Sequence, residues 1–275
     1  MFGRVAVQLT VVVENQTSSQ KLLTEWGWCV WLQDADRAVM LDTGGIQHTL
    51  TRNLEVLGLD ACRVGDIVLS HGHFDHTSGL VDMLRLAPHA RLWAAPTVGR
   101  ERLGDAQGVR CSGGGALLAG LPIQKVDPVC QVTPEITAFT VPVAERDPRW
   151  LTPGRMFERD ACGAIVPDTF EDDLSLLVKT PRGASLVLGC AHAGLSNILD
   201  YAVRTFGVDA FDTVIGGTHL GSVAGEDLPA WMEKLSEFSV RRWRPAHCTG
   251  FRAAAALSRY FSDVDWAPAG TVLEL

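Results

Sequence analysis

Residues 70–77, with the sequence SHGHFDHT, constrain this chain more than any other feature. They hold three of its eight histidines and one aspartate, directly after the run DIVL at 66–69, in which residues 67–69 are apolar. An apolar run that ends in clustered imidazoles is typical of a buried strand that delivers metal ligands at its carboxyl end. Positions two apart in an extended segment project to the same side, so His71 and His73 can bind one cation together. Gly72, between them, adds no side chain that would crowd the pair.

Other ligand-type residues extend this cluster to a second cation. Asp75 and His76 follow after a turn and can reach a cation beside the first. His192 is the best third ligand for the first cation, and His247 completes the second, because each follows a strand-like segment. The alternatives are a polar loop that happens to be rich in histidine, and core histidines satisfied without metal. Four ligand-type residues at this spacing rarely coincide, so we favour a metal site.

The pattern His-x-His-x-Asp-His resembles the signature of the metallo-β-lactamase superfamily. Further motifs follow in order: LDTG at 41–44, GCAHAG at 189–194, IGGTHL at 215–220 and HCTG at 247–250. From about Val5 to the C-terminus the series is similar to the 7,8-dihydropterin-6-yl-methyl-4-(β-D-ribofuranosyl)aminobenzene 5′-phosphate synthase subfamily. The resemblance implies an α/β protein with a four-layer αβ/βα sandwich, as a single domain over residues 1–275. Alternation of elements alone would also allow a doubly wound sheet, but a glycine fingerprint after the first strand is missing.

One position departs from the superfamily. Most members have a bridging aspartate where this chain has Cys190. A thiolate there would bind a soft metal such as zinc or iron in preference to magnesium. Equally, Cys190 could be a small buried residue without a role. Asp172 and Asp173 could supply the missing carboxylate from the side, although a turn that enters the next strand is the plainer interpretation.

Three further residues are candidates for the site. Asp42 ends a strand, and the order of the motifs favours a role in orienting a ligating imidazole, although a turn residue needs no metal. His219 follows two glycines and is expected to face the substrate, and with Asp75 to take part in catalysis. Arg244 lies in the basic run 241–244 and is a candidate substrate contact, although such runs are more often solvated.

The predicted chemistry follows from this donor set. Two divalent ions, zinc by preference with iron or manganese as alternatives, would share a water whose pKa falls toward about 7. Hydrolysis of an ester, lactone, amide or phosphoester is then expected. The subfamily's reaction instead joins an aminobenzoate to a phosphoribosyl group, with loss of carbon dioxide and pyrophosphate. We therefore predict a metallo-hydrolase or a transferase of that kind, acting on a small anionic or pterin/aminobenzoate-type substrate. An iron-based oxidoreductase of the same fold is the alternative.

Composition limits the partners and the compartment. A net charge of −8 argues against a nucleic-acid footprint over the whole surface. No apolar run is long enough to span a bilayer, and the N-terminus reads as a first strand and not as a signal peptide. The seven cysteines include no CxxC pair, so no disulfide framework is indicated and the cytoplasm is expected. The expected partner is a small molecule, and the oligomeric state is not predicted.

Strand-like and helix-like segments alternate along the chain. We expect strands at 5–13, 28–32, 38–41, 66–70, 91–95, 174–178, 185–188, 213–215 and 240–245. We expect helices at 46–57, 79–86, 195–206, 228–238 and 251–261. Residues 123–143 suggest hairpin strands, and residues 142–167 look irregular. The Gly-rich stretch 104–120 is predicted to be a flexible insertion or flap over the site.

Overall fold

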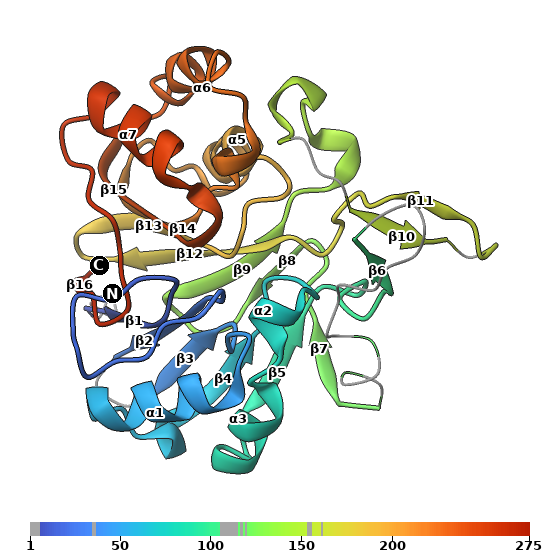
Figure 1. Cartoon of the computed structure of the whole chain (residues 1–275), viewed down its shortest axis with the longest axis vertical. Helices are drawn as coiled ribbons and strands as arrows, with labels where there is room; N and C mark the ends of the chain where they lie inside the picture. The colour runs from blue at the N-terminus through green and yellow to red at the C-terminus, as the bar shows by residue number, and fades with distance from the viewer. Residues whose placement is uncertain are drawn as a thin grey trace.

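The computed structural model describes residues 6–34, 37–104, 115, 118, 120–152, 156–160 and 162–275. Two large sheets lie face to face, and helices cover the outer face of each (Figure 1). A small third sheet stands at one side of the molecule. The predicted Gly-rich stretch 104–120 lies mostly outside the described residues.

The first large sheet has seven strands in the order β16-β1-β2-β3-β4-β5-β7. They are β1 (Gln8–Val13), β2 (Cys29–Gln33), β3 (Ala38–Leu41), β4 (Val64–Val68), β5 (Arg91–Ala94), β7 (Ile123–Lys125) and β16 (Val272–Glu274). Strands β3, β4 and β5 run parallel, so their carboxyl ends meet at one edge.

The second large sheet has six strands in the order β15-β14-β13-β12-β9-β8. They are β8 (Val129–Gln131), β9 (Ile136–Thr140), β12 (Leu174–Thr180), β13 (Gly183–Leu188), β14 (Phe211–Gly217) and β15 (Val240–Ala246). Strands β13, β14 and β15 are parallel. All residues of β14 are buried, as expected for a central parallel strand that is covered on both faces.

The remaining elements are helices, short 3₁₀ turns and a three-stranded sheet. The α-helices are α1 (Gln47–Leu57), α2 (Phe74–Thr77), α3 (Leu80–Leu86), α5 (Leu195–Phe206), α6 (Leu228–Leu235) and α7 (Phe251–Tyr260). The 3₁₀ turns are η1 (Ala61–Arg63), η2 (Val143–Glu145), η3 (Pro148–Trp150), η4 (Leu220–Ser222) and η5 (His247–Thr249). The small sheet pairs β11 (Ile165–Pro167), β10 (Phe157–Arg159) and β6 (Arg102–Leu103).

Three apolar clusters hold the layers together. The central cluster joins Val30 and Leu41 of the first sheet to Leu176 and Ile215 of the second. A second cluster packs α1 and α3 against the first sheet, and a third packs α5, α6 and α7 against the second. The order is therefore helix, sheet, sheet, helix, which is the four-layer sandwich predicted from the sequence (Figure 1).

Helix α5 illustrates why the periodic segments fold as predicted. Its apolar residues recur on one face, and Leu195, Ile198 and Leu199 are buried against the second sheet. Gly207 follows the last turn with a φ of 62°, a left-handed conformation that glycine adopts without strain. The observed bounds equal the predicted range 195–206.

Residues 142–167 differ from the irregular stretch that we predicted. They include the hairpin β10–β11, in which Phe157 pairs with Pro167 and Arg159 with Ile165. Strands of three residues are too short for a recognisable alternating pattern, so hydrophobic periodicity does not reveal them. Within the described residues, no helix is both long and apolar enough to cross a bilayer.

Candidate metal centre

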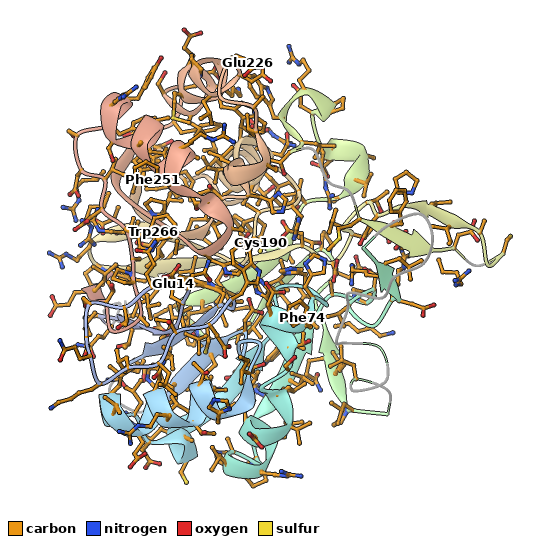
Figure 2. The ribbon with its side chains drawn as sticks, in the orientation of Figure 1. Glu14, Phe74, Cys190, Glu226, Phe251 and Trp266 are labelled. Atoms are coloured by element: carbon orange, nitrogen blue, oxygen red, sulfur yellow. The ribbon has the colours of Figure 1, made fainter. Side chains whose placement is uncertain are left out.

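The ligand-type residues meet where the two large sheets end. The loop after β4 carries His71 and His73, and the loops after β13 and β15 carry His192 and His247. Parallel strands of both sheets thus deliver side chains to one shared edge, as in other α/β sheets. Figure 2 shows Cys190 at this boundary between the two halves of the molecule.

The first group of donors consists of His71, His73 and His192. Their ligand atoms lie within 4.8 Å of one another, and all three residues are buried. His71 Nε2 faces His73 Nδ1 at 2.9 Å. Nε2 of His73 and Nε2 of His192 are buried, and neither has a hydrogen-bond partner among the described residues. Buried polar atoms are almost always paired, so such nitrogens point to a missing partner.

These three imidazoles are neutral. Burial lowers the pKa of His71 and His192 well below the ordinary value, and the neighbouring histidines lower both further. Burial likewise lowers the pKa of His73, to about 3. Neutral imidazole is the form that binds a metal ion, so this group fits a divalent cation.

The second group consists of Asp75, His76 and His247, again with ligand atoms within 4.8 Å of one another. Nε2 of His76 lies 3.2 Å from Nε2 of His247, which lies 3.3 Å from Oδ2 of Asp75. Burial alone would lower the pKa of His76, but Asp42 and Asp75 raise it to about 9. The two carboxylates therefore stabilise positive charge at this position, and they would stabilise a bound cation in the same way.

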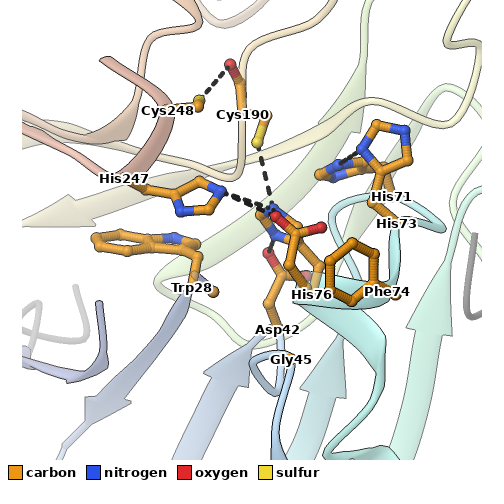
Figure 3. A network of polar contacts seen from close by, with 12 residues as sticks. Trp28, Asp42, Gly45, His71, His73, Phe74, His76, Cys190, His247 and Cys248 are labelled. Atoms are coloured by element: carbon orange, nitrogen blue, oxygen red, sulfur yellow. Dashed lines mark hydrogen bonds and ion pairs between the residues drawn. The ribbon is translucent and has the colours of Figure 1, made fainter. Parts of the chain in front are cut away.

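Cys190 lies between the two groups (Figure 3). Its Sγ is 3.2 Å from Nε2 of His76, and the ligand atoms of His71, His76 and Cys190 lie within 4.8 Å of one another. Burial raises the pKa of the Cys190 thiol well above the ordinary value. A cation would offset that cost, because metal binding deprotonates a thiol.

Asp42 orients the second group through His76. Its Oδ2 lies 2.7 Å from Nδ1 of His76, so the other nitrogen of that ring faces the cluster. The same carboxylate accepts hydrogen bonds from the backbone N–H of Ser70 at 2.7 Å and from its hydroxyl at 2.6 Å. Such a carboxylate–imidazole pair fixes ring orientation in metal sites.

Asp172 and Asp173 brace the ligand loops instead of joining either group. Asp172 accepts the N–H of Gly72 at 2.8 Å, and Asp173 accepts the N–H of Ala193 at 3.0 Å. Burial raises the pKa of Asp172 to about 7 and that of Asp173 to about 6. Neither carboxylate belongs to a donor group within the described residues, so the structure gives Asp173 no position as a ligand.

His219 reaches the centre, whereas Arg244 does not. The His219 ring lies 4.4 Å from that of His192, and its Nδ1 is 2.9 Å from Oγ1 of Thr152. Arg244 pairs with Asp263 at 2.7 Å, away from the cavities described below. The expectation that Arg244 contacts substrate therefore has no support in this geometry.

Two polar residues that the sequence did not single out hold His247. Glu14 accepts its backbone N–H at 2.7 Å. Asn15 donates to its carbonyl at 3.1 Å, and Oδ1 of Asn15 lies 3.0 Å from Nδ1 of the ring. The only signal in the sequence is a pair of polar residues at the end of an apolar strand.

Phe170 was also missed. Its ring stacks on His192 at 4.1 Å with an angle of 4° between the planes. Phe170 has a φ of 49°, which is unusual for a residue with a side chain. Arg146 holds this conformation by donating to the carbonyls of Thr169 at 2.6 Å and Phe170 at 3.0 Å.

Two adjoining cavities open beside the donor groups. The smaller, of about 180 Å³, is lined by Trp26, His73, Phe74, Asp75, Met156, Cys190, His192, His219, His247 and Cys248. The larger, of about 420 Å³, is lined by Val143, Arg146, Pro148, Leu151, Thr152, Met156, Pro167, Asp168, Thr169, Phe170, His192 and His219. They share Met156, His192 and His219, so a molecule in the larger cavity can extend toward the donors.

Known proteins with a similar sequence or structure have the fold described above. The family model of the metallo-β-lactamase superfamily matches residues 27–155. The crystal structure of Tm1679, a metal-dependent hydrolase of the β-lactamase superfamily, is 25% identical with a TM-score of 0.83, over 98% of this chain and 99% of that one. The chain has the metallo-β-lactamase fold. Both the fold class and the resemblance predicted from the sequence motifs are confirmed.

Relatives of this metallo-β-lactamase-fold protein include enzymes. The 7,8-dihydropterin-6-methyl-4-(β-D-ribofuranosyl)-aminobenzene-5′-phosphate synthase of Methanocaldococcus jannaschii is 23% identical over 82% of this chain and 80% of its own. An uncharacterised protein of the same archaeon is 24% identical over 91% and 94%. The zinc-bound PqqB of Methylobacterium extorquens shares the fold, at 13% identity and a TM-score of 0.57. The relatives indicate an enzyme of this fold, and the donor groups could hold the divalent metals typical of the superfamily.

The first donor group can be tested by removing one imidazole. Because three neutral nitrogens converge there, His73→Ala should weaken metal binding at this group by at least about tenfold and lower the metal content of the purified protein. Elemental analysis by mass spectrometry measures that content. His48→Ala, at an exposed position on α1, is the matched control and should keep its metal. Full metal content in His73→Ala would contradict the assignment.

A second prediction concerns the carboxylate behind the second group. Asp42→Asn removes the charge that orients His76 and should weaken metal binding about 10–100-fold. Competition with a chromophoric chelator measures the affinity. Asp82→Asn makes the same chemical change on the outer helix α3, where Asp82 pairs with Arg85, and should have no effect. Equal affinities in the two variants would show that Asp42 is only a turn residue.

Proposed function

We propose that this protein is a metal-dependent hydrolase that acts on a small molecule with a flat or apolar part and a hydrolysable ester, lactone, amide or phosphoester group. The observation that carries the proposal is the convergence of two donor groups, His71–His73–His192 and Asp75–His76–His247, beside a cavity large enough for such a molecule. Bound divalent ions would supply Lewis acidity and a water of lowered pKa.

The protein's own residues would orient the reactants. His76 and then His247 lower the pKa of Asp75 despite its burial, so the carboxylate stays ionised and can accept a hydrogen bond from water. Burial and the nearby His247 lower the pKa of His219 to about 4, so this ring is neutral near pH 7. With Nδ1 beside Thr152, Nε2 of His219 can contact a substrate group or exchange a proton with it.

The larger cavity favours an apolar or planar substrate part. Much of its lining is apolar, with Leu151, Met156 and Phe170 among the residues. Arg146 also lines it, but each of its three guanidinium nitrogens donates to a backbone carbonyl. A flat ring could therefore pack here while its anionic or hydrolysable group extends toward the donor groups.

A second candidate is transfer of a phosphoribosyl group to an aminobenzoate. The observation that favours it is the likeness to the methanopterin-type synthase, 23% identical over 82% of this chain. The same donors could hold a pyrophosphate leaving group, and the apolar cavity could take an aminobenzoate ring. The two reactions differ in their products, so one screen separates them.

That screen uses the protein loaded with zinc, iron or manganese. We expect hydrolysis of at least one phosphoester, lactone or amide, lost on chelation and regained when metal is restored. A phosphoribosyl donor supplied with an aminobenzoate forms the second arm, and product formation there would replace the hydrolase with the transferase. Failure of every arm with a metal-loaded protein would overturn the proposal. Liquid chromatography with mass spectrometry identifies the products.

His219→Ala tests the contact with substrate. Loss of the neutral imidazole should lower kcat/KM about 100-fold while the metal content stays unchanged, because general acid–base or orienting contacts contribute at least that much. Steady-state kinetics on the substrate found in the screen, together with elemental analysis, separates the two effects. His89→Ala, at an exposed position, is the control. An unchanged kcat/KM would remove His219 from the site.

A further inference from the structure

Two thiols face the second donor group from different loops. Cys190 follows β13, and Cys248 follows His247 in the turn η5. Both line the smaller cavity together with His247. The ligand atoms of Cys190, His247 and Cys248 lie within 4.8 Å of one another. Figure 3 shows Cys190 pointing toward His76, with Cys248 beside the backbone of Cys190.

The backbone leaves room for this pair. Sγ of Cys248 lies 3.6 Å from the carbonyl of Cys190. A Cβ at Gly217 would lie 2.6 Å from that sulfur and 2.5 Å from the carbonyl of Gly189. Any residue other than glycine at 217 would therefore crowd both the Cys248 sulfur and the backbone beside Cys190. The other described cysteines belong to neither this cavity nor any donor group.

We propose that Cys190 and Cys248 both bind the second cation as thiolates, in addition to the donors of the second group, with which they share His247. This inference rests on the proposed metal centre and names the chemistry of its second position. Two cysteines and one histidine form a donor set used by catalytic zinc. Soft sulfur donors select zinc, cobalt or iron over magnesium and manganese.

A pair of thiolates would also balance the charge of the cation at this position. Two thiolates match the charge of a divalent cation, so the cluster does not need the bridging carboxylate that Cys190 replaces. Asp75 and His76, whose Nε2 is 3.2 Å from Sγ of Cys190, remain donors within reach of the same cation. The alternative is a cysteine pair that packs in the wall of the cavity without contacting metal.

Cobalt(II) distinguishes these two cases by a readout that is independent of activity. The metal-free protein is titrated with cobalt, and absorption in the near ultraviolet reports sulfur-to-cobalt charge transfer. We expect this absorption in the wild type, a fall to about half in Cys190→Ser and in Cys248→Ser, and its loss in the double variant. Cys62→Ser, at an exposed position on η1, should match the wild type. Circular dichroism and the visible cobalt bands check that each variant folds and still binds metal at the first group.

The outcomes distinguish failure of the thiolate pair from failure of the proposed metal centre. Cobalt binding without charge-transfer absorption would overturn the thiolate pair while leaving the metal centre intact. Absorption lost with Cys190→Ser but unchanged in Cys248→Ser would also overturn it, because only one sulfur would bind. Failure to bind cobalt, zinc or iron at all would overturn the metal centre itself. Competition should in addition show that Cys190→Ser loses preference for zinc over manganese.

Discussion

Imidazole, carboxylate and thiol donors are buried together where the two sheets end, and this arrangement is costly unless a cation enters among them. Burying polar groups without partners costs free energy, and Nε2 of His73 and Nε2 of His192 have no partner among the described residues. The raised pKa of His76 points to a cation as well, because Asp42 and Asp75 favour positive charge there. Divalent ions would pair the free nitrogens and match the surrounding negative charge, which is why we interpret the cluster as a metal centre.

The fold is arranged to hold that cluster rigidly. A Cβ at Gly72 would lie 2.1 Å from the carbonyl of Val98, and one at Gly189 would lie 2.2 Å from Oγ of Ser70. Gly72 thus lets its loop approach the loop after β5 in the same sheet, and Gly189 lets a loop of the second sheet approach Ser70 of the first. Asp42 and Asn15 then fix the rings of His76 and His247 from behind. Ligand position is thus set by backbone contact as well as by side-chain hydrogen bonds.

The sequence allows prediction where the residues that act together also lie close together along the chain. The spacing of His71, His73 and His76 indicated their convergence, and apolar periodicity gave helix α5 its bounds. Prediction failed where a residue acts only through tertiary contact. Asn15 and Phe170 lie far along the chain from the histidines they contact, and no local pattern distinguishes them. Cys248 gave no signal either, because a lone cysteine after a histidine acquires meaning only beside Cys190.

The two cavities suggest how binding and chemistry are divided. The larger cavity is mostly apolar and can bind a substrate by shape and apolar contact, whereas the smaller cavity is lined by most of the donors. His192 and His219 line both, so they stand between the part of a substrate that is recognised and the part that reacts. Sulfur donors at the second position would lower the charge of that centre compared with a hard, water-rich site. A less positive centre would hold an anionic product less tightly and release it sooner.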